Sequence, residues 1–228
     1  MARHVIFDFF GTLVTYRDGV HGNPVERARA ELRRHGVAIE PAVFADSFAA
    51  CFTELEQLAS TSLREYSMLD AARVLFMDLG VAASRAALQR FVAAYLEDWS
   101  EGVEGLPLLA AWLDALAAPK SVLSNTHHEA LVAGQLQRLG IAHAFERLTT
   151  SVGHGMRKPH PSIYRAHLEA LGISAADAVF VGDNPACDYF GPRAVGIDAY
   201  LIAPRPLADV PERHRLVHLY QLSEALNR

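Results

Sequence analysis

The sequence has few cysteines and no long hydrophobic run, and both shortages narrow the classes of protein to which it can belong. Its two cysteines, Cys51 and Cys187, are too few for a disulfide framework or a cysteine-rich zinc cluster. No apolar stretch approaches the roughly 20 residues that a membrane-spanning helix needs, and the first residues lack the apolar core and cleavage site of a secretory signal. We therefore expect a cytoplasmic protein that does not contact a membrane.

Positive charge is also scarce. Lysine and arginine together number 21 against 26 aspartates and glutamates, which gives a net charge of −5, and lysine occurs only at Lys120 and Lys158. The charges are scattered and form no basic run of the kind that marks a nucleic-acid surface. We therefore expect a small-molecule substrate, no nucleic acid, and a chain that acts as a monomer or a homodimer.

What the sequence does contain is an alternation of short apolar runs with helix-like segments. It has 228 residues, of which 51% are hydrophobic, enough for one large domain or two smaller ones. The runs 4–7, 121–123, 145–150, 178–181 and 197–202 are typical of strands buried on both faces. Helical periodicity separates the later runs at 107–116, 129–139 and 161–171. This alternation predicts an α/β fold with a Rossmann-like, doubly wound parallel sheet.

One long segment interrupts the alternation. Between the first and second predicted strands the pattern is helical throughout, over 24–35, 41–59, 64–79 and 84–99. A helical block of this length inserted into an α/β chain indicates a separate domain. We expect an α/β core domain over 1–15 and 100–228, and an inserted all-helical cap domain over 16–99.

Polar residues follow three of the predicted strands at the point where each strand ends: Asp8, Ser124 with Asn125, and Asp183. The carboxyl ends of parallel strands share one edge of the sheet, and open α/β folds bind ligands at that edge. Lys158 lies in a loop before a predicted helix and could reach the same edge. Carboxylates suit a magnesium ion that also contacts phosphate, an ammonium suits phosphate itself, and a carboxylate can act as a covalent nucleophile.

In order and in wording, these pieces resemble the four motifs of the haloacid dehalogenase-like (HAD) hydrolase superfamily over essentially the whole chain. The similar segments are Asp8-Phe9-Phe10-Gly11-Thr12, Ser124-Asn125, Lys158-Pro159 and Gly182-Asp183-Asn184-Pro185-Ala186-Cys187-Asp188. Four motifs in the right order, each at a predicted strand end or loop, are a far more specific signal than any one alone. The resemblance implies a Rossmann-like core with a helical cap inserted after the first motif.

The resemblance also implies a role for each matching residue. Asp8 would be the nucleophile, and Lys158 would be catalytic beside it. The phosphate would be bound by Thr12, Ser124, Asn125 and Lys158. A magnesium ion would be held by Asp8, by the backbone carbonyl of Phe10, and by Asp183 and Asp188.

One position departs from the phosphatases of this superfamily. Two residues after the nucleophile they usually carry a second aspartate, the general acid and base, whereas this chain has Phe10. Loss of such a group lowers a rate by about 10²–10⁴-fold. We therefore expect slow turnover of alkyl phosphates, with acyl or aryl phosphates faring better. Asp18 or His21, in a glycine-punctuated segment after the motif, could carry the proton instead.

The resemblance implies first of all a hydrolase of this superfamily, probable substrates being small phosphorylated metabolites that a magnesium-dependent phosphatase cleaves through an aspartyl phosphate. One alternative is a metal-independent 2-haloacid dehalogenase, since those enzymes carry an aromatic residue at the position of Phe10. They also tend to lack the acid that matches Asp183. A second alternative is a catalytically weakened protein with a binding or regulatory role. Because two neighbouring carboxylates without a cation would raise the pKa of one of them, the presence of Asp183 beside Asp8 favours the phosphatase.

Overall fold

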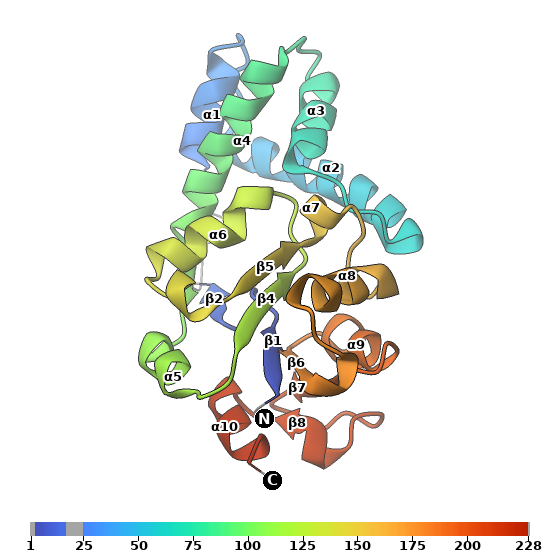
Figure 1. Cartoon of the computed structure of the whole chain (residues 1–228). Helices are drawn as coiled ribbons and strands as arrows, with labels where there is room; N and C mark the ends of the chain where they lie inside the picture. Colours follow the sequence, from blue (N-terminus) through green and yellow to red (C-terminus); the bar gives the residue numbers. More distant parts are fainter. Residues whose placement is uncertain (1–2, 17–24, 228) are drawn as a thin grey trace. The chain divides into compact units, whose positions relative to one another are not determined.

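The predicted parallel sheet is present in the computed structural model, which describes residues 3–16 and 25–227. Within those residues the sheet has six strands, in the spatial order β5-β4-β1-β6-β7-β8 (Figure 1). Their bounds are β1 His4–Phe7, β4 Lys120–Ser124, β5 Arg147–Thr150, β6 Ala178–Gly182, β7 Asp198–Ile202 and β8 Arg215–Leu216. Every neighbouring pair is parallel. This is the Rossmann-like, doubly wound α/β fold that the sequence predicts.

The shortest strands are the ones that the sequence pattern does not reveal. Strand β8 has only two residues, and β2 (Val14–Tyr16) and β3 (Val103–Gly105), which pair in a separate two-stranded sheet, have three each. Strand β5 begins at Arg147 rather than at Phe145. Runs this short carry too few residues for a periodic signal, so hydrogen bonding to a neighbouring strand defines them.

Helices in the α/β part of the chain cover the sheet. They are α5 Leu109–Ala115, α6 Glu129–Arg138, α7 Ser151–His154, α8 Pro161–Leu171, α9 Gly191–Arg193 and α10 Leu222–Ala225, with the π-helix η3 at Pro185–Phe190. Short 3₁₀ turns lie at η1 Ala142–Ala144, η2 Ala175–Asp177, η4 Glu212–His214 and η5 Leu219–Gln221. Helices α6 and α8 are followed by Gly140 and Gly172, whose φ angles of 70° and 66° suit glycine at a helix end.

Alternate residues of the central strand β1 pack on opposite faces of the sheet. Ile6 joins a buried cluster with Phe180 of β6 and with Tyr164 of α8. Phe7 points to the other face, where its ring centroid lies 6.1 Å from that of Trp112 in α5. All four residues of β1 are buried, which explains why this strand reads as a continuous apolar run rather than as an alternating one.

The chain divides into two compact units, Met1–Thr15 with Gly105–Arg228, and Tyr16–Glu104. The second unit holds α1 Glu26–Arg33, α2 Pro41–Ser62, α3 Met68–Asp78 and α4 Arg85–Ser100. Its core is rich in phenylalanine, with the ring of Phe91 5.8 Å from that of Phe48 and 5.3 Å from that of Phe76. Helical periodicity in the sequence therefore reflects a genuine apolar core of its own.

Helix α3 begins four residues later than the predicted segment 64–79, at Met68. Ser67 accepts a hydrogen bond from the backbone N–H of Asp70, and the Asp70 carboxylate accepts one from the backbone N–H of Ser67. This reciprocal capping box fixes the start of a helix. The serine and the acid three residues later are visible in the sequence and mark the start better than periodicity does.

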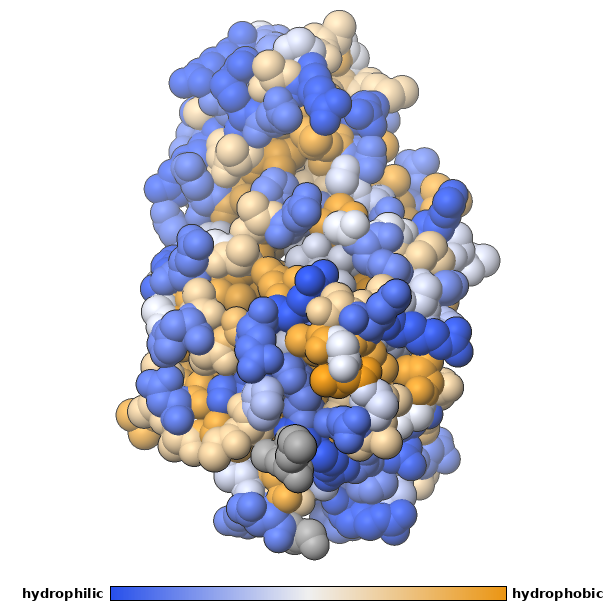
Figure 2. All heavy atoms as spheres, in the orientation of Figure 1, coloured by the Kyte–Doolittle hydropathy of each residue, from blue (hydrophilic) through white to orange (hydrophobic). Residues whose placement is uncertain are grey.

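Hydrophilic residues cover much of the face shown in Figure 2, and hydrophobic residues lie between them in small groups. The longest helix, α2, runs over Pro41–Ser62 and carries buried phenylalanines on one side only. Within residues 3–16 and 25–227, no helix has the length and apolar character needed to cross a membrane.

Candidate active site

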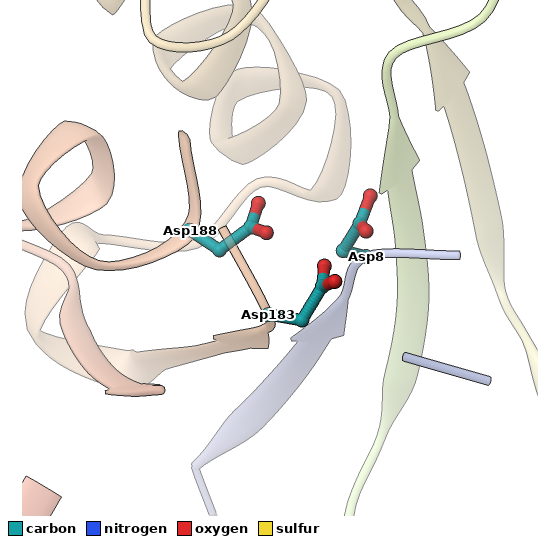
Figure 3. A group of neighbouring side chains, drawn as sticks. All are labelled: Asp8, Asp183 and Asp188. Carbon is teal, nitrogen blue, oxygen red and sulfur yellow. The ribbon is translucent and has the colours of Figure 1, made fainter. Parts of the chain in front are cut away.

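Three aspartates meet at the carboxyl edge of the sheet, as Figure 3 shows. Asp8 directly follows β1, Asp183 directly follows β6, and Asp188 lies in η3. Strands β1 and β6 are neighbours in register, and the backbone N–H of Asp8 donates to the carbonyl of Val181 at 2.9 Å. One carboxylate oxygen from each aspartate lies within 4.8 Å of the others. Strand pairing thus brings together residues that are 175 or more positions apart.

Lys158 forms ion pairs with two of these carboxylates. Its ammonium donates to Oδ1 of Asp8 at 2.7 Å and to Oδ1 of Asp188 at 2.6 Å. The lysine side chain is only 2% exposed, and its Nζ also lies 5.1 Å from the ring centroid of Phe180. An ion pair this well buried is screened little by solvent, so Lys158 strongly restrains both aspartates.

Asn125 holds the loop that carries Lys158. Its side-chain Nδ2 donates to the carbonyl of Lys158 at 3.0 Å, and its Oδ1 accepts from the backbone N–H of Lys158 at 2.8 Å. The Cys187 thiol donates to the same carbonyl at 3.3 Å. The amide of Asn125 is therefore bonded at both ends, and any contact that Asn125 makes to a phosphate would come from its backbone.

The turn that carries Asp188 is fixed by several contacts that sequence reasoning missed. The Asn184 side chain caps η3 by accepting from the backbone N–H of Cys187 at 3.0 Å, and the backbone N–H of Asn184 donates to Oδ2 of Asp188 at 2.9 Å. The buried hydroxyl of Tyr164 donates to the carbonyl of Cys187 at 2.5 Å. Both oxygens of Asp188 thus have hydrogen-bond donors, which suits a residue that orients Lys158.

Gly11 packs directly against the Asp183 carboxylate. Its φ angle is 79°, and a Cβ atom placed on it would lie 2.3 Å from Oδ2 of Asp183. Only glycine fits this close approach without displacing the aspartate. The next residue, Thr12, is buried, and its hydroxyl has no hydrogen-bond partner within the protein. A buried hydroxyl without a partner is costly, and a bound anion would satisfy it.

The electrostatic balance of the cluster is unusual. Burial raises the pKa of Asp8 to about 7, the Lys158 ammonium opposes that rise, and the neighbouring Asp188 adds to it. Loss of hydration and the charge of Asp188 also raise the pKa of Asp183. Burial lowers the pKa of Lys158, but its two carboxylate partners outweigh burial and raise the pKa overall, so the ammonium stays charged.

A depression of about 360 Å³ opens over this cluster. Six of the residues proposed from the sequence line it together with three further ones; the lining residues are Asp8, Phe10, Asn125, Lys158, Asp183, Asn184, Pro185, Cys187 and Asp188. Thr12 and Ser124 are buried and do not belong to this lining, and the Ser124 hydroxyl donates to the carbonyl of Asn125 at 3.3 Å. Asp18 and His21, the suggested substitutes for a general acid, lie outside the described residues.

Comparison with known proteins identifies the family. A model of the haloacid dehalogenase-like hydrolase family matches residues 2–196. The chain belongs to this family. It is therefore a HAD-like hydrolase, and the resemblance of its four motifs is confirmed at the level of the family.

Individual relatives cover smaller parts of this HAD-like hydrolase. Human haloacid dehalogenase-like hydrolase domain-containing protein 3 is 35% identical over 113 residues, which cover 47% of this chain and 44% of the human protein. The phosphoglycolate phosphatase of Rhodospirillum rubrum is 32% identical over 128 residues, which cover 55% of this chain and 53% of that enzyme. Each match thus spans about half the length of the relative.

Among solved structures, the crystal structure of a 2-haloacid dehalogenase from Pseudomonas syringae has a TM-score of 0.76. The two proteins are 23% identical, and the alignment covers 100% of this chain and 99% of the other. At this level of identity the likeness shows a shared fold.

The donor set of this HAD-like hydrolase fits a divalent cation. When ionised, the three neighbouring carboxylates and the single ammonium of Lys158 leave an excess of negative charge that a doubly charged ion would offset. Oxygen ligands are the ones that magnesium prefers. Asp183, the exposed member of the three, has no lysine partner of its own, which leaves it open to such an ion.

Proposed function

We propose that this HAD-like hydrolase is a magnesium-dependent phosphatase, a phosphoric monoester hydrolase that acts on a small phosphorylated metabolite through a phosphorylated Asp8. The observation that carries the proposal is the set of three carboxylates within 4.8 Å around one buried lysine. The depression above it, about 360 Å³, is of the size that small ligands occupy, roughly 300–1,000 Å³. The relatives include a protein named as a phosphatase.

In the proposed reaction Asp8 attacks phosphorus in line with the departing oxygen and becomes an acyl phosphate. Lys158, 2.7 Å from Asp8, keeps that carboxylate oriented and offsets the charge of the incoming phosphoryl group. Asp188 fixes Lys158 from the other side. Thr12 and Ser124 with the backbone of Asn125 complete the proposed phosphate contacts. Water then releases phosphate and restores the Asp8 carboxylate.

Magnesium would be held by Asp8, the backbone carbonyl of Phe10 and Asp183, with Asp188 nearby in a supporting position. When bound, the ion supplies positive charge for the phosphoryl oxygens and reduces repulsion among the carboxylates. The hydrogen bonds that occupy both oxygens of Asp188 favour a role for it in holding Lys158 and the ion's surroundings in place.

The dehalogenase alternative has one observation in its favour, which is that the aromatic Phe10 lies beside Asp8 in the lining of the depression. Its weakness is electrostatic. A metal-free site would keep Asp183 and Asp188 next to a nucleophile that must stay ionised, with only Lys158 to balance them. Like charges in one site raise the pKa of one partner, and that would leave the nucleophile protonated for more of the time.

The deciding experiment compares phosphate release with halide release, each with and without EDTA. We expect phosphate release from small phosphorylated compounds, its loss in EDTA, and its recovery when magnesium is added in excess. Asp8→Asn should lower the rate by at least about 10³-fold. The matched control is Asp114→Asn, because Asp114 is 59% exposed and pairs with the surface residue His143.

Two results would contradict the proposal. Halide release from a 2-haloacid that EDTA leaves unchanged would identify a dehalogenase. Phosphate release that survives Asp8→Asn would rule out the aspartyl phosphate. If neither product is released while a specific binding role survives Asp8→Asn, the chain is a non-catalytic member of its family.

A further inference from the structure

Proton donors around the depression are all engaged elsewhere, among the residues that the structure describes there. The Lys158 ammonium donates to Asp8 and to Asp188. The Cys187 thiol donates to the Lys158 carbonyl. Both oxygens of Asp188 already accept hydrogen bonds. A general acid must hold its proton within reach of the departing oxygen, and none of these groups has a proton to spare.

Phe10 occupies the place in the lining next to the nucleophile. Its ring packs edge-on against that of Phe9, with centroids 4.9 Å apart and an angle of 84° between the planes, and its backbone forms a β-bridge with Val14. Phe9 is fully buried, so this contact anchors the Phe10 ring. A phenyl ring neither gives nor accepts a proton, and it also removes water from the volume it fills.

We infer that the natural substrate is a phosphoryl donor whose leaving group departs as a stable anion without a proton from the enzyme, namely an acyl phosphate or an aryl or enol phosphate. This inference rests on the proposed phosphatase function and narrows its substrate class. Alkyl phosphates would be poor substrates because an alkoxide is a far stronger base than a carboxylate or a phenolate.

The proposed steps balance without a general acid. A carboxylate oxygen of Asp8 forms a bond to phosphorus, and the bond from phosphorus to the leaving oxygen breaks with its electron pair on that oxygen. The leaving group departs as a carboxylate, phenolate or enolate. Water then attacks the phosphorus of the Asp8 acyl phosphate, the bond between phosphorus and the Asp8 oxygen breaks, and both protons of the water stay on the product as dihydrogen phosphate.

Leaving groups differ enough for the effect to be large. The conjugate acid of a carboxylate has a pKa of about 4 and that of a phenolate about 10, whereas a simple alkoxide is as basic as hydroxide, whose conjugate acid has a pKa of about 16. Protonation by a positioned acid contributes about 10²–10⁴-fold to a rate. Without it, the rate should fall steeply as the leaving group becomes more basic.

The test measures kcat/KM for acetyl phosphate, a series of substituted phenyl phosphates and ethyl phosphate, with magnesium present. The rate of Asp8→Asn is subtracted to remove spontaneous hydrolysis. For the wild type we expect a steep fall in kcat/KM along the series and a solvent deuterium isotope effect close to one for the aryl substrates. Phe10→Asp should flatten the fall and raise ethyl phosphate turnover by about 10²-fold or more.

The matched control is Phe10→Leu, which removes the ring without adding an acid and should keep the steep fall. A wild type that cleaves ethyl phosphate about as fast as phenyl phosphate overturns the inference while leaving the phosphatase proposal in place. A wild type that releases no phosphate from any of the donors overturns both. If Phe10→Asp does not fold, the slope and the isotope effect of the wild type decide alone.

Discussion

A row of four polar side chains is buried inside the α/β unit, remote in sequence from the aspartate cluster. The Ser121 hydroxyl lies 2.8 Å from Nε2 of His4 and 2.8 Å from Nε2 of His167, and Nδ1 of His167 lies 2.8 Å from the Thr149 hydroxyl. The four residues come from β1, β4, β5 and α8. One serine hydroxyl has one proton and serves two rings, so the row is fully hydrogen-bonded only if one of the rings lacks a proton on Nε2.

This row predicts that the protein loses stability in mild acid. Burial, joined by the positive charges of His4 and Arg147, lowers the pKa of His167 from 6.5 to about 3. Below pH 6.5 the unfolded chain therefore binds a proton that the native state does not. The contribution of His167 to stability is complete above its unfolded pKa and is lost as the pH falls toward its folded pKa. Between about pH 7.5 and about pH 5 the loss is about 2 kcal/mol.

The assay compares urea unfolding of the wild type and His167→Gln at those two pH values. At the higher pH the variant should be less stable, because it gives up buried hydrogen bonds and packing. At the lower pH its deficit should shrink by about 2 kcal/mol, since glutamine does not titrate. The comparison is needed because Asp8, whose pKa is raised to about 7, has the opposite dependence and would mask the effect in the wild type alone.

A suitable control is Ser223→Ala, which removes the acceptor of the hydrogen bond from Nε1 of Trp112 at 3.0 Å. This change involves no titratable group, so its deficit should be the same at both pH values. If the deficit of His167→Gln is also the same at both, the native state holds a proton on His167 as readily as the unfolded chain does, and the reasoning from burial is refuted.

Two further predictions concern the aspartate cluster and the helical unit. Gly11→Ala should cost about 1–2 kcal/mol for its left-handed backbone and should also lower phosphatase activity, since its Cβ would displace Asp183; Gly36→Ala, at φ 78° with no atom within 4 Å, should show the backbone cost alone. Ser67→Ala should lower stability by about 1 kcal/mol through loss of the α3 cap, whereas Ser60→Ala, which is exposed and caps nothing, should change it little. Urea unfolding with activity measurements checks both, and equal activity of the two glycine variants would contradict the first.

The sequence predicts the strands that carry the site because they are buried on both faces. Strands β1, β4 and β6 appear as apolar runs, and each is followed by a polar residue. Parallel strands end at one edge, so the meeting of Asp8 and Asp183 follows from the pattern alone. Strand β8 does not, because two residues beside an existing sheet need no pattern of their own.

The contacts that hold Lys158 could not be predicted in the same way. Asn125 reaches the backbone of Lys158 across 33 positions, and Tyr164 reaches the carbonyl of Cys187 across 23. Such pairs depend on where two loops meet in space, and no periodicity records that. The motifs predicted that Asn125 would lie at the site but did not reveal that its side chain would be bonded to the lysine loop.

The two kinds of contact share the work of positioning the cluster. Hydrogen bonds along the sheet place Asp8 and Asp183, whose backbones continue from paired strands. Lys158 lies in a loop without such a ladder, so it needs an anchor, and the amide of Asn125 provides one by donating to one backbone group and accepting from the other. Because that anchor starts where β4 ends, the loop is tied to the same sheet that fixes Asp8. The 2.7 Å contact between Lys158 and Asp8 is thus set by the sheet on both sides.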